Sequence, residues 1–146
     1  MTFRFLDIPK IPEHLILPID QVLKLENVFE GRGLYKHSDN YTIHNVQEEL
    51  KEYLQPLFPN YSNFRYQTLR GEIPVHKDWS RNIAINYVID PGGDNAYTVW
   101  YEEDYTTPIQ DVKFPIQQWH EIRVDLYHNV TGITGQRFAI TVANKL

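Results

Sequence analysis

Hydrophobic positions at helical spacing dominate the front part of the chain. From Asn45 to Phe58 they recur every three or four residues between charged ones, and Pro59 follows. This pattern predicts an amphipathic helix that ends before the proline. A second helical pattern runs from Ile19 to Phe29, where Asp20 is a candidate N-cap. Residues 1–62 are therefore expected to form one or two helices and loops that support the rest of the fold.

From Asn63 onward, short runs rich in β-branched and aromatic residues alternate with turn-forming residues, which is typical of a β-sandwich or barrel. Two glycine-containing segments, 91–94 and 131–135, are predicted to be hairpin connections. Because 146 residues suffice for one compact domain, we expect a single domain with a mainly β core in residues 63–146. The predicted strands are Phe64 to Leu69, Asn82 to Ile89, Tyr97 to Glu102, Val112 to Phe114, Glu121 to His128 and Gln136 to Val142.

Alternation within these strands indicates which side chains share a face. In the strand predicted to end at His128, the other even-numbered positions are apolar, so His128 is expected to point inward with them. In the last strand, Arg137 and Thr141 share the face opposite the aromatic and aliphatic side chains, which we expect beneath the helices. Arg137 would then face the interior, where an unpaired charge is costly and an anionic partner is required. The same alternation places Asn86 inward.

Composition excludes several classes of protein and site. The chain has no cysteine, so any metal must be bound by His, Asp or Glu, and a cysteine nucleophile is excluded. Charges or prolines interrupt every apolar run near the amino terminus, so we expect neither a signal peptide nor a membrane span, and a soluble, cytoplasmic protein. The net charge is −5 and the 14 basic residues are scattered, which predicts no bulk binding of nucleic acid.

The candidate site consists of His76, Asp78, His128 and Arg137. Two histidines and one carboxylate can fill one face of an octahedral Fe(II) site and leave the other face for reactants. An arginine close by suits an acidic co-substrate, because guanidinium donates two parallel hydrogen bonds to a carboxylate. Each residue also has a structural interpretation, as a core histidine or an ion-pair arginine. Their joint order in a strand-rich context favours a functional site.

A second pair with the same spacing, His37 and Asp39, precedes the β-rich half. With six histidines in the chain, chance alone yields about 0.4 such pairs, so the spacing by itself is weak. His37 lies in a polar segment, and no comparable histidine and arginine follow it at strand spacing. We interpret this pair as part of a solvated loop.

A family resemblance extends over residues 64–142, in the segments VHKDWSRNIAINYVI, TVWYEE and VDLYHNVTGITGQRFAITV. These are similar to the double-stranded β-helix core, a cupin-like jelly roll, of the 2-oxoglutarate and Fe(II)-dependent oxygenases, including small stand-alone members from bacteria and viruses. The resemblance implies His76, Asp78 and His128 as iron ligands and Arg137 as the clamp on the distal carboxylate of 2-oxoglutarate. It implies a hydroxylase that uses dioxygen and converts 2-oxoglutarate to succinate while it oxidises a substrate.

The finer contacts of the family are matched less completely. Tyr66, Asn86, Arg81 and Thr141 are further candidates for contact with 2-oxoglutarate; Thr141 would substitute for a serine or threonine that many members carry where this chain has Ala139. Two alternatives stay open: a catalytically silent jelly-roll module that binds a ligand or protein, and a cupin-like metalloenzyme without 2-oxoglutarate. The sequence does not indicate whether the substrate is a small molecule or a peptide, nor the oligomeric state.

Overall fold

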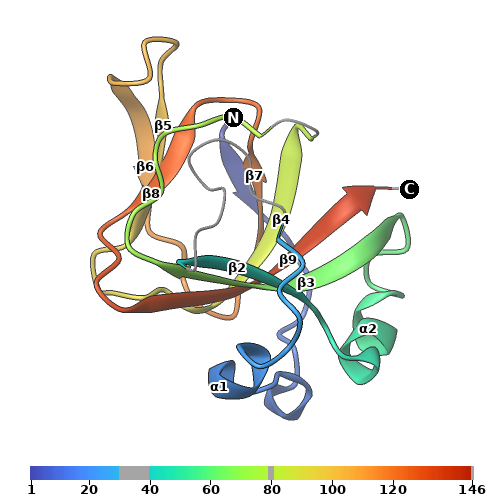
Figure 1. The fold of residues 1–146 in the computed structure, drawn as a ribbon. Coiled ribbons are helices and arrows are strands. Elements are labelled where there is room, and N and C mark those ends of the chain that lie inside the picture. The colour runs from blue at the N-terminus through green and yellow to red at the C-terminus, as the bar shows by residue number, and fades with distance from the viewer. Residues whose placement is uncertain (30–39, 79–80, 146) are drawn as a thin grey trace.

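The computed structural model describes residues 1–29, 40–78 and 81–145, and within them two antiparallel sheets face each other as a jelly roll (Figure 1). One sheet has six strands in the order β1-β7-β4-β9-β3-β2, and the other has three in the order β6-β5-β8. The expected mainly β, cupin-like fold is therefore confirmed. The strands are β1 Phe3–Phe5, β2 Tyr41–Asn45, β3 Tyr61–Arg70, β4 Ile83–Asp90, β5 Tyr97–Tyr101, β6 Pro108–Val112, β7 Trp119–Arg123, β8 His128–Thr131 and β9 Gln136–Lys145; the helices are η1 Glu13–Leu15, α1 Ile19–Val22 and α2 Glu48–Leu54.

The outer face of the six-stranded sheet is covered by α2 and by residues 6–22, called the amino-terminal segment below. Both lie below β3 and β9 in Figure 1. The expected faces of the last strand are confirmed there, since Phe138 and Ile140 of β9 belong to this core. Leu50 and Leu54 anchor α2 in it and are fully buried. Each contributes about 2 kcal/mol by leaving water. A helix of seven residues is unstable alone, so this packing is what keeps α2 folded.

The two helices predicted from the sequence, which correspond to α1 and α2, are shorter than the hydrophobic spacing predicts. The helix expected over Asn45–Phe58 is limited to Glu48–Leu54, because Asn45 ends β2 and pairs with Arg65 of β3. The helix expected over Ile19–Phe29 is limited to Ile19–Val22. Its later residues run beside β2 instead, where the Val28 amide donates to the Ile43 carbonyl at 2.7 Å. In both cases pairing along β2 competes with the helix.

The prediction of one continuous strand from Glu121 to His128 is wrong, because these residues are divided between two strands in different sheets. β7 ends at Arg123 in the six-stranded sheet, and β8 begins at His128 in the three-stranded sheet. One backbone hydrogen bond at each end of the crossing continues the pairing within a sheet: the Val124 amide donates to the Asn82 carbonyl at 2.9 Å beside β4 and β7, and the Tyr101 amide to the Tyr127 carbonyl at 2.8 Å beside β5 and β8. The inward direction of His128 therefore does not follow from alternation along one strand.

The two glycine-containing connections are also not hairpins. Segment 91–94 follows β4 and precedes β5, segment 131–135 joins β8 to β9, and each pair of strands is divided between the two sheets. The segments meet each other, since the amides of Thr134 and Gly135 both donate to the Gly92 carbonyl, at 2.9 and 2.7 Å. They form corners where the chain passes from sheet to sheet.

The remaining strands differ from expectation at the edges of the sheets. β1 and β2 form the edges of the six-stranded sheet and were not predicted, while the strand expected over Val112–Phe114 is β6, Pro108–Val112. β6 pairs with β5 through the turn at residues 102–107. Edge strands carry only one row of inter-strand hydrogen bonds and little burial, which weakens their sequence signal.

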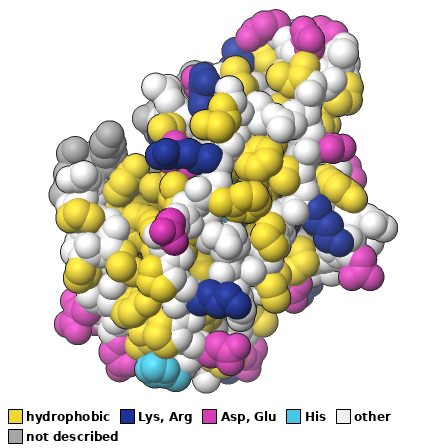
Figure 2. Space-filling model, turned by 180° about the vertical axis from the view of Figure 1, so that it is seen from behind, with side chains coloured by type: hydrophobic (Ala, Val, Ile, Leu, Met, Phe, Trp, Pro, Cys, Tyr) yellow, Lys and Arg dark blue, Asp and Glu magenta, His cyan; other side chains and the backbone are white. Residues whose placement is uncertain are grey.

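The surface shows how the charges are distributed. On the face in Figure 2, Lys and Arg side chains are spread singly among acidic and hydrophobic ones. That face has no continuous basic stripe of the kind that binds a phosphate backbone. Among the described residues, no helix combines the length and apolar character needed to cross a membrane.

Candidate metal centre

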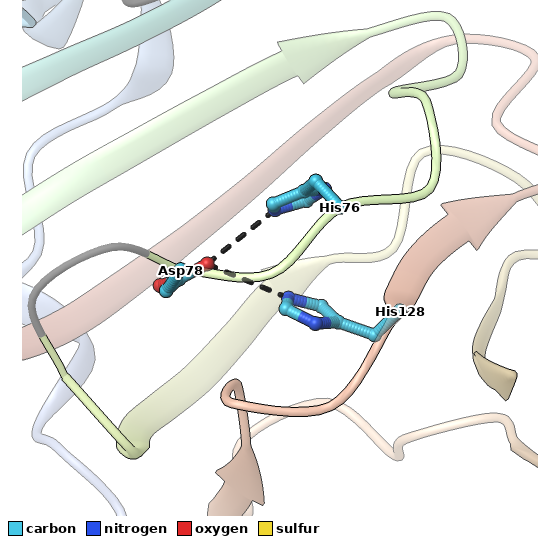
Figure 3. Close-up of side chains that lie close together, drawn as sticks. All are labelled: His76, Asp78 and His128. Carbon is cyan, nitrogen blue, oxygen red and sulfur yellow. Dashed lines mark ion pairs between the residues drawn. The ribbon is translucent and has the colours of Figure 1, made fainter. Parts of the chain in front are cut away.

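His76, Asp78 and His128 lie together because backbone hydrogen bonds tie the segment after β3 to the start of β8 and to the residue that follows β7 (Figure 3). The amides of His76 and His128 each donate to the carbonyl of the other, at 3.0 and 2.9 Å. The Asp78 amide donates to the Val124 carbonyl at 2.8 Å. Three residues separated by up to 52 positions are thereby brought to one point by main-chain pairing.

Both imidazole rings are held through their Nδ1 atoms. His76 Nδ1 lies 2.9 Å from the Pro74 carbonyl, and His128 Nδ1 lies 2.7 Å from the Leu126 carbonyl. A carbonyl only accepts, so Nδ1 carries the proton in each neutral ring and Nε2 keeps its lone pair. Metal-binding histidines have this arrangement, in which the second partner sets both tautomer and ring orientation.

The three remaining donor atoms converge. Asp78 Oδ1 lies 3.4 Å from His76 Nε2 and 3.6 Å from His128 Nε2, the two contacts dashed in Figure 3. All three ligand atoms lie within 4.8 Å of one another. Neighbouring donors of an octahedral ion at about 2.1 Å stand about 3 Å apart, so the set fits a divalent metal after small side-chain shifts.

The second oxygen of Asp78 is held by a cation. Its Oδ2 accepts a hydrogen bond from Arg81 Nε at 2.9 Å. Burial opposes the negative charge, but the contact with His76 and the charge and hydrogen bond of Arg81 outweigh it, so the pKa of Asp78 lies below its ordinary value. The carboxylate is ionised at neutral pH, as a metal ligand must be.

The two histidines differ in their pKa values. For His76, burial opposes protonation, but the contact with Asp78 and the Pro74 carbonyl outweigh it and raise the pKa. For His128, which is more deeply buried, desolvation dominates and lowers the pKa. A metal bound here would therefore displace a proton from His76 more than from His128.

A cavity of about 450 Å³ lies between the sheets beside these ligands, large enough for a small molecule. Arg137, Asn86 and Ala139 line it, as the alternation in β4 and β9 predicts. Arg137 donates from Nη1 to the Pro91 carbonyl at 3.2 Å. Burial lowers its pKa to about 10, so it keeps its charge at neutral pH.

Four further residues are candidates for contact with 2-oxoglutarate, and only two of them, Asn86 and Arg81, line the cavity. Asn86 lines the cavity, and its buried Oδ1 has no hydrogen-bond partner among the described residues. Thr141 lies beside Asn86 in the neighbouring strand and is also buried, but it is not part of the cavity wall. Arg81 lines the cavity next to Asp78.

Tyr66, a further candidate for contact with 2-oxoglutarate, is not part of the cavity wall. Tyr66 belongs to the core under the helices, on the opposite face of the sheet, because its register partner in β9 is Ile140. Its hydroxyl donates to Gln47 Oε1 at 2.7 Å and accepts from the Leu17 amide at 3.1 Å. Tyr66 therefore holds the amino-terminal segment and the segment before α2 onto the sheet.

His120 was missed by the sequence reasoning and lines the cavity. It lies opposite Asn86 in the adjacent strand and is buried. The predicted strand began one residue later, at Glu121, although the inward positions Ile122 and Val124 continue the same alternation back to His120. A longer strand would have found it. The pair His37 and Asp39, interpreted as loop, lies outside the described residues.

Comparison with known proteins finds a likeness among solved structures. No family model matches the sequence, and no curated protein matches it. The structure is similar to an oxidoreductase of the 2OG-Fe(II) oxygenase family from Burkholderia pseudomallei, with a TM-score of 0.57 and 9% identity over 85% of this chain and 74% of that one. Weaker likenesses include Fe(II)-HppE with an alternative substrate (TM-score 0.49, 13% identity, 77% of this chain and 53% of that chain). A cupin-2 domain containing protein from Shewanella frigidimarina has a TM-score of 0.44 and 9% identity, over 91% and 98% of the two chains. At these identities the first likeness shows a shared fold.

Proposed function

We propose that this protein is an Fe(II)- and 2-oxoglutarate-dependent oxygenase that hydroxylates a small molecule or a peptide. The supporting observation is that three ligand atoms converge beside a cavity that Arg137 also lines. The fold shared with a protein described as a 2OG-Fe(II) oxygenase agrees with this proposal.

His76, His128 and Asp78 would hold the metal through two Nε2 atoms and Oδ1. This set suits Fe(II), because it fills one face of an octahedron and leaves the other open. Bound iron would supply the redox chemistry by which 2-oxoglutarate, dioxygen and a substrate R–H give succinate, carbon dioxide and R–OH. The protein contributes ligands, orientation and exclusion of water.

Arg137 would bind the distal carboxylate of 2-oxoglutarate. Its guanidinium has five N–H groups, so the bond to the Pro91 carbonyl leaves donors available. A carboxylate would also supply the anionic partner that a buried cation needs. Asn86 lies on the same cavity wall, and its Nδ2 group would be the atom that donates to a carboxylate, because Oδ1 only accepts.

A cupin-like metalloenzyme without 2-oxoglutarate is the second candidate. One observation favours it: Arg137 already interacts with the charge of Asp90 and with the Pro91 carbonyl, so it could serve to hold the corner after β4. In that case the metal ligands keep their role and the arginine is structural.

Anaerobic titration with Fe(II), followed by 2-oxoglutarate, tests these assignments. Chelation of the keto acid is expected to produce a weak visible absorption band that His76→Ala lacks. Arg137→Gln removes a charged hydrogen bond of about 1.5–3 kcal/mol, so the 2-oxoglutarate concentration for half-maximal absorption should rise about 10- to 100-fold. Arg4→Gln is the matched control, because this exposed arginine pairs with Glu121 away from the cavity lining.

The outcomes separate the candidates. Iron binding without the band, and without succinate under oxygen, supports the cupin-like enzyme and contradicts 2-oxoglutarate dependence. Failure to bind iron contradicts both enzymes and leaves the non-catalytic binding module. Screening peptides and metabolites for stimulated succinate formation would then identify the substrate class.

A further inference from the structure

Arg81 is not one of the three candidate metal ligands, but it contacts one of them, Asp78. It follows Asp78 by three positions and donates from Nε to Asp78 Oδ2 at 2.9 Å. About one third of its side chain is exposed, against 20% for Asp78, so the pair lies at the edge of the cavity rather than on the open surface. A pair in this position is less screened than a surface ion pair.

The two oxygens of Asp78 thus have different partners. Oδ1 lies 3.4 and 3.6 Å from the two Nε2 atoms, on the side where the ligand atoms converge. Oδ2 is turned to Arg81 and is engaged by a charge-assisted hydrogen bond. For both oxygens to bind one metal, the carboxylate would have to rotate and break this bond.

We propose that Arg81 is a positioning residue that keeps Asp78 bound to a divalent metal through Oδ1 alone. This inference rests on the metal site of the proposed function. With one carboxylate oxygen and two imidazoles, the protein occupies three of six positions and leaves three, enough for a bidentate keto acid and dioxygen. A two-oxygen carboxylate would leave one position too few.

A simpler interpretation predicts the opposite effect on affinity. If Arg81 were merely a counter-ion for Asp78, removing its charge would strengthen metal binding, because a nearby cation repels a divalent ion. If Arg81 orients the carboxylate, its removal weakens binding, since partners of metal ligands typically contribute 10- to 100-fold in affinity. The change in affinity, taken together with the spectrum of the bound metal, therefore discriminates between the two roles, because a counter-ion leaves the coordination and the spectrum unchanged.

Lys77 provides a matched control on the same segment. It lies between two of the metal ligands and also lines the cavity, but its ammonium contacts Glu103 at 3.3 Å and the ring of Tyr127 at 4.4 Å. Lys77→Gln removes the same unit of charge near the site without touching Asp78 Oδ2. It measures the purely electrostatic contribution.

The experiment is calorimetric titration of the full chain with Co(II), without 2-oxoglutarate, together with the visible spectrum of bound Co(II). Arg81→Gln is expected to weaken Co(II) binding about 10- to 100-fold and to change the spectrum. Lys77→Gln should bind Co(II) as tightly as the wild type or slightly tighter, with an unchanged spectrum. Arg81→Lys keeps the charge without the guanidinium geometry and should restore at most part of the affinity. Circular dichroism verifies that each variant is folded.

Equal or tighter Co(II) binding by Arg81→Gln, with the wild-type spectrum, would overturn the positioning role while leaving the proposed function intact. Equal weakening in Lys77→Gln would also overturn it, because the effect would then not depend on contact with Asp78. If the wild type binds no Co(II), the proposed function and this inference both fail. Unfolding of Arg81→Gln leaves Arg81→Lys as the test, and full wild-type affinity in that variant counts against guanidinium positioning.

Discussion

His76, His120 and His128 all line the cavity, but their rings have different surroundings. His76 and His128 direct Nε2 toward Asp78. His120 lies flat against Phe114, with ring centroids 3.7 Å apart and planes inclined by 6°. Burial lowers its pKa to about 4, despite the contact of its Nδ1 with the Gln118 carbonyl. His120 is therefore neutral at pH 7, and charging it must disturb the fold.

Acid should destabilise the protein partly through His120. Its pKa is about 4 in the folded protein and about 6.5 when unfolded, so between these values the unfolded chain binds more protons and stability falls as the pH falls. The full shift corresponds to about 3 kcal/mol. His120→Phe keeps a ring against Phe114 without a titrating group, so its loss of stability from pH 7.5 to 4.5 should be about 2–3 kcal/mol smaller. Urea unfolding at both pH values measures this, and identical losses in the two proteins would contradict it.

At the scale of elements, the corners where the chain passes between the sheets are closely packed against each other. The β8–β9 corner brings Gly132 against the corner before β5, with a φ of 79°. A Cβ on Gly132 would lie 2.0 Å from the Asn95 carbonyl oxygen. Gly71, which turns the chain after β3, has a similar φ of 71°, but a Cβ there would meet nothing within 4 Å.

This pair of glycines separates backbone strain from steric overlap. Alanine costs about 1–2 kcal/mol at either position, because both have left-handed backbone. Gly132→Ala must also displace backbone, which adds about 1–3 kcal/mol. In urea unfolding, Gly132→Ala should therefore be the less stable variant by that margin. Equal stability of Gly132→Ala and Gly71→Ala would show that the corner yields without cost.

At the scale of the whole molecule, the candidate metal centre connects the segment after β3 to the start of β8. Two backbone hydrogen bonds between His76 and His128 contribute to that bridge. A metal held by side chains of both segments would reinforce it. The two sheets are also joined by corners, by hydrogen bonds such as that from Trp100 Nε1 to the Arg123 carbonyl, and by the packing of Trp100 against Val88 and Ile122 in one buried cluster.

Metal binding should therefore raise thermal stability. A ligand that binds only the folded state at about 100 times its Kd contributes about 2.7 kcal/mol. For a chain of this size that corresponds to a Tm increase of about 5–10 °C. Thermal unfolding with and without Co(II) measures the increase, which a chelator should reverse. His76→Ala should show none of it, and a persistent increase in that variant would mean that the metal binds elsewhere.

Several features were predictable from the sequence because they depend on neighbours along one strand. Alternation placed Arg137, Ala139 and Asn86 on the cavity side and Phe138 in the outer core. Tyr66 could not be placed this way, because its face depends on the register of β3 against β9. The break between β7 and β8 was equally hidden, since the apolar alternation continues through the crossing residues.

The sequence by itself determined the mainly β class, the inward faces of β4 and β9 and the choice of His76, Asp78, His128 and Arg137 as candidates. It could do so because alternation and residue chemistry are local properties. Only the tertiary structure decided that Nε2 of both histidines and Oδ1 of Asp78 converge, and that Arg81 donates a hydrogen bond to Oδ2 of Asp78. Those contacts depend on pairing between segments far apart in the chain, and no local pattern encodes which distant backbone a strand end will meet.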